Sequence, residues 1–383
     1  KAEDLFAALD TVVLDEWHEL MGSKRGSQTE LCLSWLRQHR PSLQTWAISA
    51  TIGNLEQAGR HALGTEGKPL IVGGAPVRVT EIHSILPDSI DGFPWAGHLG
   101  LRMYEELVAR LNPGVSTLLF TNTRNQSERW HQCLRFACPE MDDALALHHS
   151  AIDRSEREAI EAAVKAGSIR WVVCTSSLDL GVDFQPVEQV VQIGSPKNLA
   201  RLLQRAGRSA HLPGGTSQVL FMPTNALELL ELSAVRRGLG EGLVEQRKPP
   251  MAPLDVLLQH LTSLACGPGL EPETSYDAVR SSAAYADLGR DDWDWCLKFL
   301  EQGGDCLGAY PRYRKLEWDT ETKRFRVREK AIARLHRLNV GTITAAPSIT
   351  VRFVRGAVLG HVEETFIGQL KPKDVFFFSG RQL

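Results

Sequence analysis

Short apolar runs alternate with amphipathic stretches through the middle of this 383-residue chain. Runs rich in β-branched and aromatic residues predict buried strands at Thr117–Phe120, Ala144–Leu147, Trp171–Thr175, Val187–Ile193 and Gln218–Met222. Helical spacing of apolar positions predicts helices between them, at Asn125–Phe136, Arg154–Lys165, Leu199–Arg208 and Ala226–Arg237. This alternation is typical of a parallel sheet covered by helices, so we expect an α/β lobe over residues 98–245.

Residues 1–97 carry a shorter version of the same pattern. Thr11–Leu14 and Thr45–Ile48 have the composition of buried strands, and Gln28–Arg40 has the apolar periodicity of a helix. A stretch rich in Gly and Pro follows, with two short strands expected near Leu70–Val72 and Val77–Ile82. We place the link to the next lobe at Asp88–Gly97, because Gly and Pro interrupt both periodicities there.

The composition changes again after the proline-rich linker Lys248–Pro253. Three helical patterns follow, and then two strands, at Leu254–Leu264, Ser275–Tyr285, Asp291–Leu300, Leu307–Leu316 and Arg324–Arg328. This order predicts a winged helix over residues 246–330, which could either bind DNA or serve only for packing. Residues 331–383 have a third, β-rich composition, and we expect their last strand, Phe376–Phe378, to lack pairing partners.

Composition and charge are those of an ordinary globular protein. Apolar residues make up 43% and charged residues 23%, and no run approaches the roughly 20 apolar residues of a membrane span. Seven cysteines without a Cys-x-x-Cys pair favour reduced thiols and a cytosolic location. The net charge of −3 argues against a uniformly basic surface, so nucleic-acid binding would have to be local. Residues 310–337 fit that description, with ten Lys or Arg against four Asp or Glu and interleaved aromatics, although an ordinary half-buried hairpin explains the pattern equally well.

Two polar motifs follow the two strands of the first segment. Asp15, Glu16 and His18 come directly after Thr11–Leu14, and paired carboxylates at a strand end suit phosphoryl transfer, which needs a metal ion and a positioned water. The alternative is the ordinary preference for acidic residues at a helix N-terminus. Ser49, Ala50 and Thr51 follow the second strand and could instead serve only as a helix cap.

Three further polar motifs follow strands of the middle lobe. They contain Thr121, Asn122, Thr123 and Arg124, then His149 and Ser150, then Thr175 and Ser176. Because carboxyl ends of parallel strands share one edge, these hydroxyl, amide and guanidinium groups are placed for sequence-independent contacts with phosphates. Turn and cap chemistry is the alternative. Metal binding by His148 and His149 is improbable, because neighbouring residues of a strand point to opposite faces.

The sequence Gln204-Arg-Ala-Gly-Arg208 is the strongest single motif of the chain. Arg205 and Arg208 are three residues apart and share one helical face, where two guanidiniums suit a polyphosphate. A solvent-facing helix surface is the alternative. Gly181 and Asp183 lie in the turn that precedes this helix.

Together, and in this order, the motifs resemble those of DEXH-box superfamily 2 helicases, and most closely the large helicase-related (Lhr) family, in its ligase-associated branch. The resemblance implies two RecA-like lobes, the first one partial, followed by a winged helix and the start of a β-rich domain. It implies that Asp15 and Glu16 bind ATP and Mg²⁺, the metal mainly through water, and that His18 and Ser49–Thr51 couple the lobes. It further implies that Thr121–Arg124, His149, Ser150, Thr175 and Ser176 hold nucleic acid, and that Gly181, Asp183, Gln204, Arg205 and Arg208 complete the nucleotide site.

The function implied is an ATP-dependent motor that moves 3′-to-5′ on single-stranded DNA. Expected substrates are DNA or RNA–DNA duplexes in bacterial DNA repair, with a monomeric protein in the cytosol and nucleoid, no membrane contact, and a repair nuclease or ligase as partner. The alternatives are a non-catalytic single-strand binding module and a translocase that does not separate strands. Two features depart from the family pattern. His211 stands where the wider superfamily usually has an arginine, a departure that matches the large helicase-related branch better. No Gly-x-x-x-x-Gly-Lys-Ser/Thr loop occurs, so we expect a fragment with little ATPase activity of its own.

Overall fold

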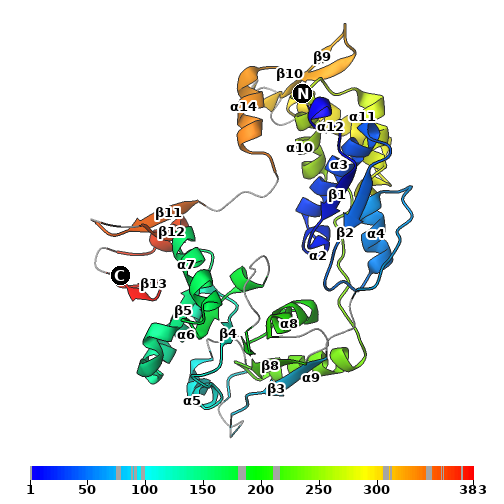
Figure 1. Ribbon diagram of the computed structural model, residues 1–383. Helices are drawn as coiled ribbons and strands as arrows, with labels where there is room; N and C mark the ends of the chain where they lie inside the picture. The colour runs from blue at the N-terminus through cyan, green and yellow to red at the C-terminus, as the bar shows by residue number, and fades with distance from the viewer. Residues whose placement is uncertain are drawn as a thin grey trace. The chain divides into compact units, whose positions relative to one another are not determined.

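The computed structural model describes residues 2–74, 79–87, 89, 93–95, 100–179, 187–209, 216–304, 310, 313–341, 347–354, 356, 358–371 and 374–383 (Figure 1). The chain folds as two compact units, each assembled from two separate stretches of sequence. Unit 1 joins Lys1–Gly73 to Gln246–Ala345, and unit 2 joins Gly74–Glu245 to Ala346–Leu383. Among the described helices, none has the length and apolar character that crossing a membrane would require.

Unit 2 is built on a six-stranded, fully parallel sheet of order β3-β8-β7-β4-β6-β5. Its strands are β3 (Thr80–Ser84), β4 (Thr117–Phe120), β5 (Leu145–His148), β6 (Trp171–Cys174), β7 (Gln189–Ile193) and β8 (Ser217–Met222). The intervening helices are α5 (Tyr104–Val108), α6 (Arg124–Ala137), α7 (Arg154–Lys165), α8 (Leu199–Ala206) and α9 (Leu227–Gly240). The predicted α/β fold with a parallel sheet is confirmed.

Burial on both faces explains why the central strands have continuous apolar sequences. Alternate residues of a strand point to opposite faces, so Leu119 of β4 joins one core cluster while Leu118 and Phe120 join the other. Trp130 of α6 fills the first cluster, and Leu202 of α8 fills the second. Helices therefore cover the sheet on both sides.

The predicted boundary at residue 97 differs from the observed one. Strand β3 pairs with β8 along its whole length, so the second compact unit begins at Gly74 and not after the Gly- and Pro-rich segment. The described residues of the predicted link, Asp88–Gly97, thus lie within unit 2. An edge strand that is half exposed has a weak apolar signal, which explains the misplacement.

The C-terminal segment packs on unit 2 and forms its own small core. It contains β11 (Ser348–Arg352), β12 (Val358–Glu363), α15 (Glu364–Ile367), β13 (Phe377–Phe378) and β14 (Arg381–Gln382). Gly360 of β12 bridges to Ile152 after β5, and Phe378 packs with Ala151 and Leu359. The expectation of an unpaired last strand was wrong, because β13 pairs with β14 in a terminal hairpin.

Unit 1 combines the first segment with the winged helix. The first segment supplies the parallel strands β1 (Thr11–Leu14) and β2 (Gln44–Ala47) and the helices α2 (Trp17–Met21), α3 (Lys24–His39) and α4 (Leu55–Leu63). The winged helix supplies α10 (Leu254–Ala265), α11 (Pro272–Arg280), α12 (Arg290–Gln302), the antiparallel hairpin of β9 (Leu316–Asp319) and β10 (Arg324–Val327), and α14 (Lys330–Leu338). The three predicted helices are confirmed, and a hairpin follows them, but its first strand is Leu316–Asp319 and not the predicted Leu307–Leu316. Helix α14 stays in this unit, so residues 331–383 do not form one domain as predicted.

The buried carboxylate of Glu30 in α3 connects the first segment of unit 1 to the winged helix. The carboxylate is 1% exposed and accepts hydrogen bonds from His61 Nδ1 at 2.7 Å and from the backbone N–H of Ala284 at 2.8 Å. Leu31, next in sequence, lies in one core cluster with Val256 and Trp293 of the winged helix. The first segment and the winged helix therefore share a core, although the sequence predicts separate domains.

We expect Glu30→Ala to lower the free energy of unfolding of unit 1 by about 3 kcal/mol, because it leaves a buried N–H and a buried imidazole without their acceptor. Urea unfolding, combined with hydrogen exchange at the Ala284 amide, measures the loss. Glu56→Ala, at an exposed position of α4, is the matched control and should change the value by less than about 0.5 kcal/mol. Equal stability of the two variants would contradict the assignment.

A buried histidine makes the stability of unit 2 depend on pH. His131 of α6 packs beneath Gly380, and burial lowers the pKa of its imidazole to about 4 from a normal 6.5. The unfolded chain therefore binds an extra proton between these two values, and stability is lost as the pH falls through this window. We expect His131→Gln to reduce that slope by up to about 1.4 kcal/mol per pH unit in urea unfolding between about pH 6.5 and about pH 5. His83→Gln, at an exposed histidine of the same unit, should leave the slope as it is.

Candidate nucleotide and nucleic-acid sites

The Asp15–Glu16 turn of unit 1 has an unusual backbone. Strand β1 ends at Leu14, and Glu16 adopts left-handed dihedral angles, with φ 49° and ψ 42°, at the start of α2. The Asp15 carboxylate accepts a hydrogen bond of 2.9 Å from the Glu16 N–H. A non-glycine residue in this region stores strain, which occurs most often at functional sites. The turn leaves Asp15 exposed and Glu16 partly exposed, so both carboxylates are accessible to a ligand.

His18 connects this turn to the segment after β2. Its imidazole is 1% exposed and lies 3.1 Å from Ser49 Oγ and 3.5 Å from the Glu16 carboxylate. Burial lowers the pKa of His18, so the ring is held neutral. The backbone reinforces the contact, because the Trp17 N–H donates to Ile48 O at 2.9 Å. The structure thus brings together two motifs that the sequence places 31 residues apart.

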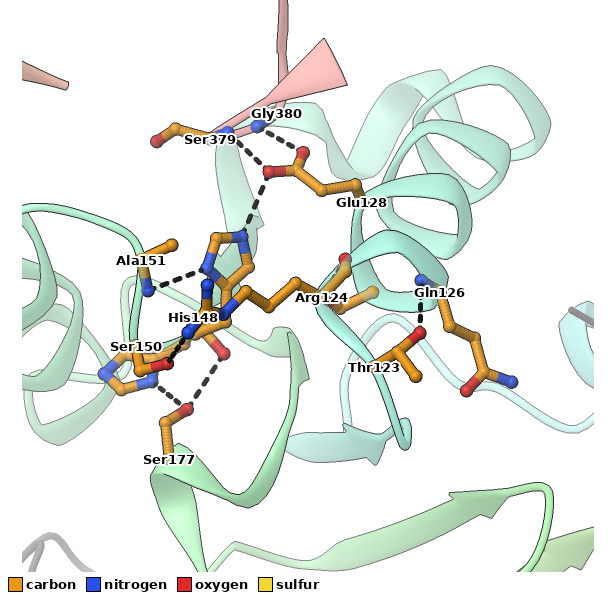
Figure 2. Close-up of polar contacts among 12 residues, drawn as sticks. Thr123, Arg124, Gln126, Glu128, His148, Ser150, Ala151, Ser177, Ser379 and Gly380 are labelled. Atoms are coloured by element: carbon orange, nitrogen blue, oxygen red, sulfur yellow. Dashed lines mark hydrogen bonds and ion pairs between the residues drawn. The ribbon is translucent and has the colours of Figure 1, made fainter. Parts of the chain in front are cut away.

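The carboxyl edge of the unit 2 sheet gathers the predicted nucleic-acid residues. Thr121 is buried and donates to Cys174 O at 3.1 Å, and Thr123 caps α6 by accepting from the Gln126 N–H at 3.1 Å. Their hydroxyls therefore make the turn and cap contacts weighed as the alternative. Arg124 donates to Ser150 Oγ at 3.1 Å, and both of these side chains are exposed (Figure 2). Exposed members of the set are Thr123, Arg124, Ser150 and Ser176, whereas Asn122 is half-buried and Thr175 buried.

His149 is not placed to bind nucleic acid, and this prediction is corrected. The ring is 1% exposed, with Nε2 3.0 Å from the Glu128 carboxylate and Nδ1 accepting from the Ala151 N–H at 3.3 Å. His148 points to the other face, toward Ser177 and Glu161, as the strand geometry predicts. Throughout the described ranges, no three His, Cys, Asp or Glu side chains gather as a metal site.

Arg205 also departs from its predicted role, because it is a buried structural residue. The side chain is 1% exposed and forms a bidentate ion pair with Asp179, with N–O distances of 2.8 and 3.2 Å. Nη1 donates to Gln192 Oε1 at 2.5 Å, and the guanidinium lies over the Phe120 ring at 4.6 Å. These contacts use three of the five N–H donors and one face of the guanidinium, and the side chain is buried, so Arg205 does not point toward a phosphate in this conformation.

Arg208 is the arginine of the pair that stays partly exposed. Helix α8 ends at Ala206, and Arg208 follows on a short 3-10 turn, where Nη2 donates to the carbonyl oxygen of Asp179 at 2.9 Å. Asp179 thus fixes both arginines, one through its carboxylate and one through its backbone. Gln204 is half-buried. Gly181, Asp183 and His211 lie outside the described residues.

Sequence reasoning missed Asp179 and Glu128. Both carboxylates are 5% exposed, and both are bonded to side chains that the motifs had singled out. Asp179 had a signal, since an acidic residue inside a largely apolar turn requires a cationic partner. Glu128 had none, because a glutamate within an amphipathic helix usually faces water.

Comparisons with known proteins agree with this arrangement. The helicase conserved C-terminal domain matches residues 101–212, and the winged helix domain of large helicase-related protein matches residues 237–383. The chain is 32% identical over 379 residues to ATP-dependent helicase Lhr-Core protein 2 of Thermococcus barophilus, covering 97% of this chain and 44% of that protein. It is 30% identical over 391 residues to ATP-dependent helicase Lhr-Core of Methanothermobacter thermautotrophicus, covering 100% and 45%. The chain therefore spans less than half the length of these relatives.

Solved structures share the fold. The Mycobacterium smegmatis helicase Lhr bound to ssDNA and AMP-PNP superposes with a TM-score of 0.76 at 25% identity, over 90% of this chain and 45% of that one. The DUF1998 helicase MrfA bound to DNA superposes with a TM-score of 0.74 at 18% identity, over 99% of this chain and 52% of that one. The second likeness concerns the fold alone.

The buried ion pair of Arg205 with Asp179 should contribute more to the stability of unit 2 than an exposed ion pair does. We expect Arg205→Met to lower the free energy of unfolding of unit 2 by about 3 kcal/mol, because Asp179 stays buried with only Arg201, 3.4 Å away, as a cation. Arg154→Met removes an exposed i,i+4 ion pair and should cost less than about 0.5 kcal/mol. Urea unfolding measures both. A fully stable Arg205→Met protein would restore the phosphate-sensing interpretation.

Proposed function

Because the chain belongs to the large helicase-related family, we propose that it is part of an ATP-dependent motor that moves 3′-to-5′ along single-stranded DNA. The motor unwinds DNA or RNA–DNA duplexes during DNA repair. Support comes from relatives named ATP-dependent helicases and from a similar structure bound to ssDNA and AMP-PNP. We place the protein in the cytosol and nucleoid as a monomer, with a repair nuclease or ligase as partner, because that is where such a motor meets its DNA.

The observation that carries the proposal is the contact between His18 and Ser49. It ties the carboxylates of the Asp15–Glu16 turn to the hydroxyl-rich segment Ser49–Thr51 through one neutral, buried ring. A change in the carboxylate turn must move Ser49, because a buried ring has little room to adjust by itself. In this proposal the contact transmits the state of the nucleotide to the rest of unit 1.

The residues of the turn fit a hydrated divalent ion. The Asp15 carboxylate is exposed and has one oxygen bonded to the Glu16 N–H, which holds it in place. Asp15 and Glu16 would therefore hold Mg²⁺ mainly through water. When bound, the ion supplies positive charge that neutralises the phosphates of ATP. Glu16 orients the attacking water and accepts its proton, and the fixed backbone of the turn limits where that carboxylate can point.

On unit 2, the proposed roles differ from those predicted for the two arginines. Arg208 contacts the phosphates of ATP, because it is partly exposed and the hydrogen bond from its Nη2 to the Asp179 carbonyl oxygen holds it at the end of α8. Arg205 is a positioning residue that binds the Asp179 carboxylate. The Asp179 carbonyl oxygen in turn accepts a hydrogen bond from Arg208 and so orients it. Thr123, Arg124, Ser150 and Ser176 hold the sugar-phosphate backbone with groups that do not depend on base sequence.

Residues 1–383 are proposed to hydrolyse ATP slowly by themselves, because they contain no phosphate-cradling Gly-x-x-x-x-Gly-Lys-Ser/Thr loop. The test therefore uses the complete protein. We expect ATP hydrolysis stimulated by single-stranded DNA, and a loss of about 100-fold or more in kcat for Glu16→Gln and Arg208→Ala. A strand-displacement assay with blunt and 3′-tailed duplexes then separates unwinding from translocation alone.

Glu56→Gln, at an exposed position of unit 1, is the matched control and should keep wild-type turnover. Tight DNA binding without turnover in the wild-type protein would reject the motor and leave a non-catalytic binding module. Turnover without displacement of either duplex would leave a translocase that does not separate strands.

A further inference from the structure

A pocket opens in unit 2 between α6, the loop after β5 and the C-terminal segment. Its volume is about 570 Å³, which is within the range of sites for small organic molecules. Four phenylalanines and two arginines are among its lining residues, namely Phe366, Phe376, Phe377, Phe378, Arg124 and Arg129. The wall is accessible, because Phe366 is 41% and Val375 59% exposed.

The aromatic wall has a defined geometry. Phe366 of α15 and Phe376 meet edge to face, with ring centroids 5.6 Å apart. The Arg129 guanidinium lies over the Phe377 ring at 5.6 Å and forms no ion pair with a described residue. Arg129 therefore supplies a guanidinium at the pocket that can face a phosphate.

The carboxylates that line the pocket are bonded to other groups of the protein. Glu128 lies at the floor, but its carboxylate accepts from the N–H groups of Ser379 and Gly380 at 2.5 and 2.9 Å (Figure 2), and His149 Nε2 lies 3.0 Å away. A carboxylate that is buried and engaged in this way has few lone pairs left to accept from a ligand. The other lining carboxylate, Glu363, lies 3.7 Å from Arg124.

The floor also makes the pocket a built site. The turn at Ser379–Gly380 is fixed on α6 by Glu128, and Gly380 has φ +71° with no room for a Cβ, which would lie 2.8 Å from the His131 ring. These contacts therefore fix the position of the C-terminal wall of the pocket relative to the wall from α6. Preorganised walls reduce the ordering cost of binding.

We propose that this pocket takes a base of single-stranded DNA, stacked on the Phe366–Phe376 wall, with Arg129 facing a neighbouring phosphate. The proposal rests on the proposed function. Its basis is continuity, because Arg124 lines the pocket and also donates to Ser150, at the sheet edge where the DNA backbone is proposed to lie. A strand held at that edge has its next base within reach of the pocket. Arginine beside aromatic rings is the composition that binds single strands without sequence preference.

The test uses the complete protein and an oligonucleotide that carries 2-aminopurine, whose fluorescence is quenched by stacking. We expect Phe366→Ala and Arg129→Gln each to weaken DNA binding by about tenfold, and the first to abolish the quenching at one position of the strand. The kcat for ATP at saturating DNA should stay unchanged. Photocrosslinking from 4-thiothymidine should label the peptide that contains Phe366.

Phe136→Ala is the matched control, because Phe136 lies at the other end of α6 and is 90% exposed. It should bind DNA as the wild-type protein does. Both test positions are exposed, so circular dichroism should report a folded protein, and Arg129→Gln keeps the aromatic wall intact if Phe366→Ala proves unstable. Wild-type affinity for DNA in both variants, or crosslinks confined to other peptides, would contradict DNA binding in this pocket. In that case DNA-stimulated ATP hydrolysis would still support the motor. Absence of DNA-stimulated hydrolysis in the wild-type protein would instead reject the proposed function.

Discussion

All six strands of the unit 2 sheet run in one direction, and this constraint determines where polar chemistry can lie. The central strands are buried on both faces, so a polar side chain within them, such as His148 or Gln192, needs a hydrogen-bond partner to offset its lost hydration. The polar segments therefore follow the strands, and the carboxyl ends of β4, β5 and β6 bring theirs to a common edge. Arg124 and Ser150 meet there although 26 residues separate them.

Three buried carboxylates connect parts of the chain that are distant in sequence. Glu30 joins the first segment to the winged helix, Asp179 joins the loop after β6 to the Gln204–Arg208 motif, and Glu128 joins α6 to the terminal turn. Each accepts hydrogen bonds from backbone N–H groups or from a guanidinium, which lowers the cost of burying a charge. Removing such a carboxylate exposes unsatisfied donors on both sides of the contact. The hydrogen bonds of each of these three carboxylates therefore help to hold together segments of one unit that are distant in sequence.

The sequence predicted best what depends on local pattern. The strands of unit 2 were found from continuous apolar runs, and the helices of the winged helix from their periodicity. Strand β3 was assigned to the wrong segment, because pairing with β8 joins residues more than 130 positions apart and leaves no local trace. The same limit applies to Ser379 and Glu128, which are 251 residues apart.

At the candidate sites, the sequence predicted which residues lie near one another better than it predicted what each side chain does. His18 contacts Ser49 within unit 1, whereas the coupling of the two lobes by His18 and Ser49–Thr51 stays a prediction. Arg205 and His149 have the side chains expected of ligand contacts, but both are 1% exposed and are held by Asp179 and Glu128. Helical spacing places two arginines on one face without revealing which of them is covered by a neighbouring loop.

The interleaved composition of the two units has a consequence for biosynthesis. The two core clusters of the unit 2 sheet are built from residues 82–239, so this sheet can close its core before the winged helix has been synthesised. Helix α3 of unit 1 must wait for the winged helix, because its Leu31 shares a cluster with Val256 and Trp293. Domains that fold as units during synthesis usually do so one after another from the N-terminus. Here the order is reversed for one interface, because the core that Leu31 shares with the winged helix closes only after the unit 2 sheet has been made, although Leu31 precedes that sheet in the sequence.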